Sequence, residues 1–160
     1  MIESLMLAVI LNGSPAESAE QPPVAEVQVG RTAYQGVREA ALRNSTRGFA
    51  PSLYQGKWYK KKWEDERKCI MRRESRFNYR AANKSSSARG AYQFLDSQWR
   101  VSLTHMLMPE HKDRKKEVRA LRDKPIHKWS RYWQDAAFYV AWRHGKGAKH
   151  WYYPGSDCIG

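Results

Sequence analysis

The sequence lacks long apolar stretches and has very little cysteine. The apolar run from Leu5 to Leu11 has seven residues, whereas a helix that crosses a bilayer needs about 20, so no transmembrane span is predicted. The two cysteines lie far apart, and the five histidines show no ligand spacing with a carboxylate or a thiol, so no metal motif is recognisable. Glycine-rich nucleotide-binding motifs and a Ser-His-Asp order are also missing. We therefore expect no cofactor and no metal.

Acidic residues are also scarce in relation to basic ones. The chain has 16 Asp and Glu against 29 Lys and Arg, a formal net charge of +13. Residues 46–160 carry 26 of these bases and 11 of the acids, while residues 1–45 carry three bases and five acids. A basic surface of this kind attracts an anionic partner. Nucleic acid is the less favoured partner, because no recognised motif places basic side chains on a groove-reading element.

Residues 1–45 are predicted to form an N-terminal attachment arm. The apolar run Leu5–Leu11 precedes a turn-rich linker from Asn12 to Pro23, and residues 31–43 have the pattern of a short helix. Glu3 stands before the apolar run and no Lys or Arg does, which favours a docking segment over the core of a signal peptide. Glycine and proline at positions 48, 51 and 56 indicate the boundary to a second domain, which we place at residues 46–160.

This second domain is predicted to be mainly α. A first helix is expected over residues 57–75, since Tyr59, Trp63, Ile70 and Glu74 share one face. Further helices are expected over residues 98–108, capped by Asp96 or Ser97; over 111–122, anchored by Val118 and Leu121; and from about Ser130 to Gly145, burying Trp133, Ala137 and Val140. Residues 91–94 are predicted to be a short extended segment that lines a cleft.

Glu74 is the candidate catalytic residue, because it ends the apolar stripe of the first predicted helix. Apolar surroundings raise the pKa of a carboxyl group, which is what a general acid requires near neutral pH. A polar loop rich in Asn and Ser follows at residues 76–89. An acid beside an apolar helix face and a polar loop able to bind a sugar are what the cleavage of a glycosidic bond needs. The alternative is that Glu74 only forms an ion pair with Arg72, Arg73 or Arg76.

Three sequence blocks resemble known families. Glu74-Ser75, followed by Ala-Arg-Gly-Ala-Tyr-Gln at residues 88–93, resembles the E-S and G-A-R-G-L-M-Q blocks of soluble lytic transglycosylases. Gln93-Phe94, followed by Trp99, resembles the spacing of the resuscitation-promoting-factor domain, a small lysozyme-like relative. Together with a third block, the resemblance covers roughly residues 56–160.

The third block lies at residues 141–151 and is similar to the A-Y-N-A-G-x-G-A segment of transglycosylases. Its two glycines and the following alanine match. Trp142 and Arg143 stand where the family has a Tyr-Asn pair, so the usual substrate contacts of that pair are not carried over unchanged.

The resemblance implies an α+β lysozyme-like fold and muramidase chemistry on peptidoglycan. Glu74 would protonate the oxygen between N-acetylmuramic acid and N-acetylglucosamine and then act as base on the C6 hydroxyl, giving a 1,6-anhydro product. That route needs one carboxylate, whereas a usual hydrolytic lysozyme needs two. The nearest downstream acid, Asp96, suits a helix cap, which favours a transglycosylase over a hydrolase. A glycan-binding domain that has lost its activity is a further alternative.

Substrate contacts are expected around Glu74. Gln93 can hydrogen-bond an acetamido or hydroxyl group, and Tyr92 and Trp99 can stack on sugar faces. By position in the family blocks, the resemblance adds Ser75, Gln98, Trp142 and Arg143. For Trp99 and Trp142 the alternative is a place in the core, which aromatic residues at helical spacing often take.

The resemblance also implies a disulfide between Cys69 and Cys158, since resuscitation-promoting-factor domains carry cysteines at both of these places. The alternative is two unrelated thiols. A disulfide suits an oxidising setting.

We expect the protein to be part of a phage particle and to act on the bacterial cell wall, with other virion subunits binding residues 1–45. A secreted or periplasmic protein is the alternative.

Overall fold

A computed structural model describes residues 41, 45–155, 157 and 158. The chain divides into two compact units, Met1–Tyr34 and Gln35–Gly160, and the described residues belong to the second. The predicted apolar docking run, the linker and nearly all of the short helix at 31–43 lie outside the described residues. Ser45 and Thr46 are tied to the second unit, because Arg131 donates to Ser45 Oγ at 2.6 Å and the Tyr79 N–H donates to the Thr46 carbonyl at 2.9 Å.

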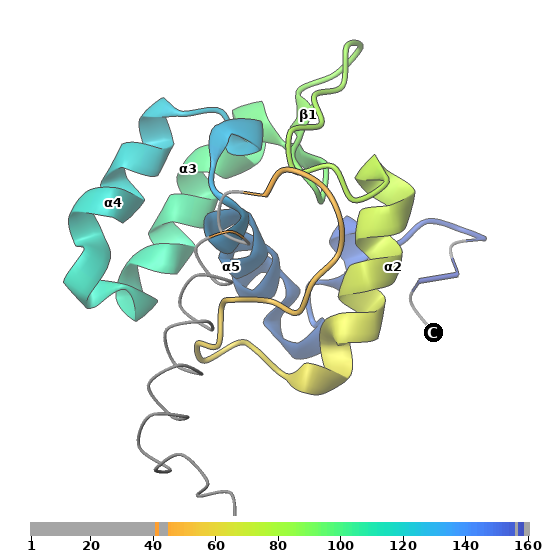
Figure 1. The fold of residues 1–160 in the computed structure, drawn as a ribbon, viewed down its shortest axis with the longest axis horizontal. Helices are drawn as coiled ribbons and strands as arrows, with labels where there is room; N and C mark the ends of the chain where they lie inside the picture. The colour runs from red at the N-terminus through yellow and green to blue at the C-terminus, as the bar shows by residue number, and fades with distance from the viewer. Residues whose placement is uncertain (1–40, 42–44, 156, 159–160) are drawn as a thin grey trace, which may run out of the picture. The chain divides into compact units, whose positions relative to one another are not determined.

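The described part of the chain is mainly helical (Figure 1). Its α-helices are α2 (Glu64–Ser75), α3 (Asp96–Leu107), α4 (Lys115–Ala120) and α5 (Arg131–Trp142). Strands β1 (Ala88–Arg89) and β2 (Phe94–Leu95) form an antiparallel hairpin, with Ala88 opposite Leu95. Short 3₁₀ turns connect these elements, at Lys61–Trp63, Met108–Glu110, Lys112–Arg114, Leu121–Asp123, Ile126–Lys128, Arg143–Gly145 and Ala148–His150.

Helix α5 forms the centre of this unit. Every residue of α5 except Tyr132 is buried, as expected for a helix that is covered on all sides. Figure 1 shows α5 between α2 on one side and α3 and α4 on the other. Helix α3 packs against it, and Leu103 and Leu107 of α3 are fully buried. Val118 and Leu121 are buried as predicted, and they anchor α4 and the turn that follows it.

A buried ion pair joins α2 to α5. Arg67 Nη1 lies 3.2 Å from Asp135 Oδ1, and neither side chain is exposed. The hydroxyls of Tyr79 and Tyr92 donate to the same carboxylate oxygen at 2.8 and 2.6 Å, and Arg67 also pairs with Glu64 at 2.8 Å. Burial raises the pKa of Asp135, and Arg67 and the two hydroxyls oppose that shift. The network therefore fixes α2, the helix that carries Glu74, to the core helix α5 through the contact between Arg67 and Asp135.

The first helix is shorter than predicted. It begins at Glu64, after a 3₁₀ turn, and not at residue 57, so Tyr59 is not part of its apolar face. Glu110 is the physical reason, because its carboxylate accepts the hydroxyl of Tyr54 and, at 3.2 Å, the N–H of Lys57. The backbone then turns, with the Tyr59 N–H bound to the Gly56 carbonyl at 3.0 Å.

The expected cap of α3 and the expected extended segment are also wrong. Helix α3 begins at Asp96 itself, and its N-cap Leu95 offers no side-chain bond. Asp96 Oδ1 instead accepts the N–H of Ile126 at 2.7 Å. Residues 91–93 form the turn of the hairpin and only Phe94 is extended, since Gln93 has a left-handed backbone with φ 50°. The last helix ends at Trp142, three residues before Gly145, because Arg143 also takes a left-handed conformation.

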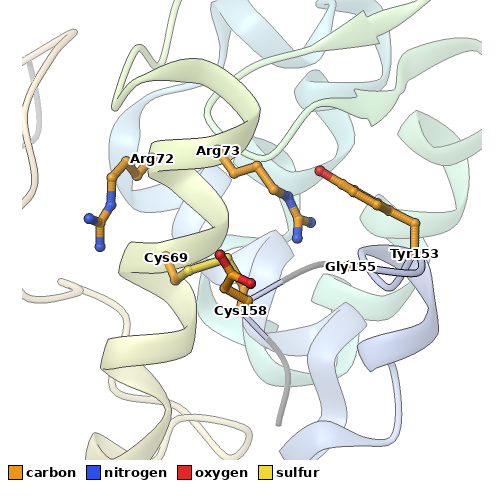
Figure 2. A pocket seen from close by; sticks show the side chains of 7 residues that line it. Cys69, Arg72, Arg73, Tyr153, Gly155 and Cys158 are labelled. Carbon is orange, nitrogen blue, oxygen red and sulfur yellow. A yellow bond between two sulfur atoms is a disulfide. The ribbon is translucent and has the colours of Figure 1, made fainter.

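A disulfide joins α2 to the end of the described chain. Cys69 and Cys158 are bonded, with their Cα atoms 5.4 Å apart and 89 positions between them in sequence (Figure 2). This is the pairing that the resuscitation-promoting-factor resemblance implied. Among the described residues, no helix is long and apolar enough to cross a membrane.

The buried pair generates a stability prediction. Asp135→Asn keeps the shape of the side chain but leaves the guanidinium of Arg67 without its full counter-charge. We expect a loss of about 3 kcal/mol in the free energy of unfolding, at the low end for a broken buried pair because Glu64 still contacts Arg67. Urea unfolding measures it. The matched control is Glu117→Gln, in the exposed pair with Arg114, which should cost at most about 1 kcal/mol; equal losses in both variants would contradict the role of the buried pair.

The disulfide generates a second prediction. The double variant Cys69→Ser/Cys158→Ser should lose about 2–4 kcal/mol of unfolding free energy, because a long loop is no longer closed in the unfolded chain. A reducing agent should destabilise the unmodified protein by a similar amount and leave the double variant unaffected in urea unfolding. If the reductant weakened both proteins equally, its effect would not come from this bond.

Candidate active site

Glu74 lies at the C-terminal end of α2, where the helix is stopped by backbone geometry. Arg76 adopts a left-handed conformation with φ 52°, and its N–H bonds the carbonyl of Arg72 at 3.0 Å, as in the αL motif that ends many helices. Ser75 Oγ donates to the Ala91 carbonyl at 2.8 Å. The end of the helix, and with it Glu74, is therefore fastened to the turn of the β-hairpin.

A small pocket of about 220 Å³ lies in front of Glu74. Its walls come from α2, the hairpin, α3 and the turn at Ala148–His150 with the residue after it: Glu74, Tyr92, Gln93, Phe94, Leu95, Trp99, His150 and Trp151. Among these described residues Glu74 is the only carboxylate. The rest of the lining is mostly aromatic, with one amide.

The hairpin turn depends on a glycine. Gly90 has φ +78°, and a Cβ there would lie 2.4 Å from Gln134 Oε1. That oxygen accepts the N–H of Ala91 at 2.9 Å, so the amide of Gln134 fills the space that a side chain would take. Gln93 then folds back, with Nε2 donating to the Gly90 carbonyl at 2.9 Å. The Ala-Arg-Gly-Ala-Tyr-Gln block thus shapes one wall of the pocket.

Arg73 holds the carboxylate of Glu74. Its Nε and Nη2 donate to Glu74 Oε1 at 3.1 and 2.9 Å, and the two side chains are 18% and 23% exposed. The alternative that Glu74 pairs with a neighbouring arginine is therefore also realised, on the same residue that lines the pocket. Because Arg73 binds Oε1, Oε2 is the oxygen through which Glu74 can exchange a proton with a ligand.

The C-terminal segment holds Arg73 in turn. Arg73 Nη2 donates to the carbonyl of Trp151 at 2.6 Å, and its guanidinium lies 4.5 Å from the ring centre of Tyr153. Figure 2 shows Arg73 directed toward Tyr153, while Arg72 points away to the other side of α2. The Cys69–Cys158 disulfide closes this segment onto the helix a few residues later. Trp151, Tyr153 and the disulfide at Cys158 are thus part of what positions Glu74.

The third sequence block forms the opposite wall. Trp151 Nε1 donates to the Tyr92 carbonyl at 3.0 Å, and the Trp151 ring packs edge-on against Phe94 with centres 5.4 Å apart. His150 meets the ring of Trp99 at 4.5 Å. Burial lowers the pKa of His150, and the nearby Lys149 and Arg143 lower it further, so the neutral imidazole is favoured.

Two of the predicted substrate contacts belong to the core. Tyr92 is 1% exposed, stacks on Phe138 at 4.7 Å and donates its hydroxyl to Asp135, so its ring cannot stack on a sugar. Trp142 is also 1% exposed and packs against Trp63 and Phe138, which is the core alternative.

The other predicted residues separate into three groups. Gln93 and Trp99 line the pocket with Glu74. Ser75 has a structural role, through its bond to Ala91. Gln98 and Arg143 are exposed and lie outside this pocket, although Arg143 lines a neighbouring one. Sequence reasoning missed Leu95, His150 and Trp151 as lining residues; the last two end the third block, which was the available signal.

Among the described residues that line the pocket, no second acid accompanies Glu74. Asp96 binds the Ile126 N–H through Oδ1 and lies 3.6 Å from Arg100 through Oδ2, so it is engaged away from the pocket. Within the part of the chain that the structure describes, no group of three or more His, Cys, Asp and Glu side chains is placed to hold a metal ion.

The arrangement offers one proton-exchanging oxygen, an amide and aromatic surfaces around a space the size of a sugar ring. Such a set suits acid–base chemistry at one bond of a ligand that has both polar edges and apolar faces. No protein-family model, no curated protein and no solved structure matches this chain.

Proposed function

We propose that this chain is a peptidoglycan-cleaving muramidase with a lysozyme-like domain, and that it acts as a lytic transglycosylase. The observation that carries the proposal is Glu74 as the sole carboxylate among the described residues of a sugar-sized pocket, with Gln93 and Trp99 beside it. The three sequence blocks add support, because residues from each of them line that pocket.

The proposed reaction uses Glu74 twice. Its protonated Oε2 gives the proton to the glycosidic oxygen, and the bond from that oxygen to C1 of the muramic acid breaks, releasing the N-acetylglucosamine side with a new hydroxyl. The carboxylate then takes the proton of the C6 hydroxyl, whose oxygen bonds to C1 and closes the 1,6-anhydro ring. Arg73 keeps the carboxylate in place through both steps, because its two N–H groups bind Oε1 and leave Oε2 for the substrate.

The single carboxylate favours this route over hydrolysis. Retaining and inverting glycosidases of the usual kind place a second carboxylate about 5–9.5 Å from the first, as a nucleophile or to activate water. Asp96, the nearest downstream acid, is bound to Ile126 and Arg100. An internal hydroxyl of the substrate supplies the nucleophile in transglycosylation, so a second acid is not required.

The disulfide between Cys69 and Cys158 supports a setting outside the reducing cytosol. A disulfide that closes an 89-position loop is typical of oxidising compartments. The excess of basic residues suits a polyanionic target such as the bacterial wall. We propose a virion-associated protein that opens the wall locally and attaches to the particle through residues 1–45, of which only residues 41 and 45 are among the described residues.

The central test is Glu74→Gln. The substitution preserves size and hydrogen bonding but removes the acid, so the rate of muropeptide release from purified peptidoglycan should fall by about 10²–10⁴-fold. Mass spectrometry of the products follows the reaction, and 1,6-anhydro products, lighter by one water than hydrolytic ones, identify the transglycosylase.

Glu117→Gln is the matched control, because it makes the same change at an exposed site outside the pocket and should keep full activity. Unchanged cleavage in Glu74→Gln would remove Glu74 from the mechanism. Products with ordinary reducing ends would replace the transglycosylase by a hydrolase, and no products from the unmodified protein would leave a glycan-binding domain without activity.

A further inference from the structure

A second pocket adjoins the pocket of Glu74. It encloses about 370 Å³ and is lined by Trp99, Met106, Ala141, Arg143, Lys146, Gly147, Lys149 and His150. Trp99 and His150 line both pockets, and their rings meet at 4.5 Å. A linear ligand that lies across Glu74 and passes these two rings therefore enters the second pocket.

The charged side chains that line the second pocket are all basic. Arg143, Lys146 and Lys149 are all exposed, and no carboxylate is among the described residues that line it. None of the three takes part in a salt bridge within the described residues. Three like charges on one small surface repel one another, and a bound anion would relieve that repulsion.

The fold holds these three cations on one compact turn. Arg143 is left-handed, with φ 46°, and its Nε donates to the Val140 carbonyl at 3.3 Å. The N–H of Gly147 returns to the Trp142 carbonyl at 2.8 Å, and a Cβ on Gly147 would lie 1.9 Å from the Ala141 carbonyl oxygen. The glycine thus allows the turn to close tightly, which brings residues 143, 146 and 149 to the same pocket.

We infer that this cationic pocket, formed by Arg143, Lys146 and Lys149, binds the carboxylates of the peptide stems on the glycan strand that Glu74 cleaves. The inference rests on the proposed function and names its substrate class, which is peptide-bearing rather than bare glycan. Stem peptides are attached to the muramic acid residues of the strand. A strand that crosses Glu74 therefore brings the carboxylates of these peptides to the neighbouring pocket. Lysine and arginine side chains at an exposed surface pair with such groups without a large desolvation cost.

The test measures binding by full-length protein carrying Glu74→Gln, so that strands stay intact. The probes are purified glycan oligosaccharides with intact stem peptides, and the same oligosaccharides after an amidase has removed the peptides. Adding Lys146→Gln/Lys149→Gln should weaken binding of the peptide-bearing strands by about three- to tenfold and change binding of the bare strands by less than twofold. The affinity difference between the two probes should also shrink as salt is raised.

Lys112→Gln/Lys115→Gln is the control, because it removes the same charge at exposed positions that do not line either pocket. It should alter neither affinity. Equal affinity for both probes would overturn the inference. It would also be overturned if removing the stem peptides left the affinity unchanged and only an attached phosphodiester polymer made the strands bind more tightly.

Cleavage by the protein with Glu74 intact separates the two proposals. If it cuts bare and peptide-bearing strands equally well, the stem assignment is wrong and the muramidase stands. If it cuts and binds neither, both are wrong.

Discussion

The contact between Arg67 and Asp135 is the constraint on which the rest of the described structure depends. It pairs a guanidinium with a carboxyl group where neither side chain is exposed, and two tyrosine hydroxyls donate to the same carboxylate oxygen that Arg67 binds. One of these hydroxyls belongs to Tyr92 in the hairpin turn, so a single carboxylate orients α2, α5 and the hairpin together. Glu74 lies seven residues beyond Arg67 on the same helix, about two helical turns away, so the contact of Arg67 also fixes the position of Glu74.

The sequence predicts the helical content well and its boundaries less well. The burial of Val118 and Leu121 and the helix over Trp133, Ala137 and Val140 follow from apolar spacing, which is a local signal. The late start of α2 does not follow, because it is set by Glu110, more than 50 positions away from the residues it binds. Asp96 has the chemistry of a cap, yet the N–H of Ile126, 30 positions downstream, takes its oxygen.

The site shows the same division between local and distant causes. The position of Glu74 at a helix end beside a glycine-containing turn can be predicted from residues 57–99, which is a local stretch of the chain. The burial of Tyr92 cannot, since it is decided by Asp135 and Phe138 on a helix far along the chain. The contribution of Trp151 to Arg73 is equally non-local, because it joins positions 78 apart. Residue type and local spacing single out Glu74 as the candidate acid, whereas the residues that hold it in place are determined by the tertiary fold.

The disulfide between Cys69 and Cys158 has a consequence for the order of events in the cell. The ribosome makes the chain from the N-terminus, so α2 and Glu74 emerge well before Trp151, Tyr153 and Cys158. Until those residues are made, the pocket lacks one wall and Arg73 lacks its carbonyl partner, and the disulfide can form only after that. A growing chain thus carries Glu74 in a pocket that is incomplete and not yet closed by the disulfide. For a protein proposed to cut bacterial wall, that delay would keep synthesis and attack apart in time and place.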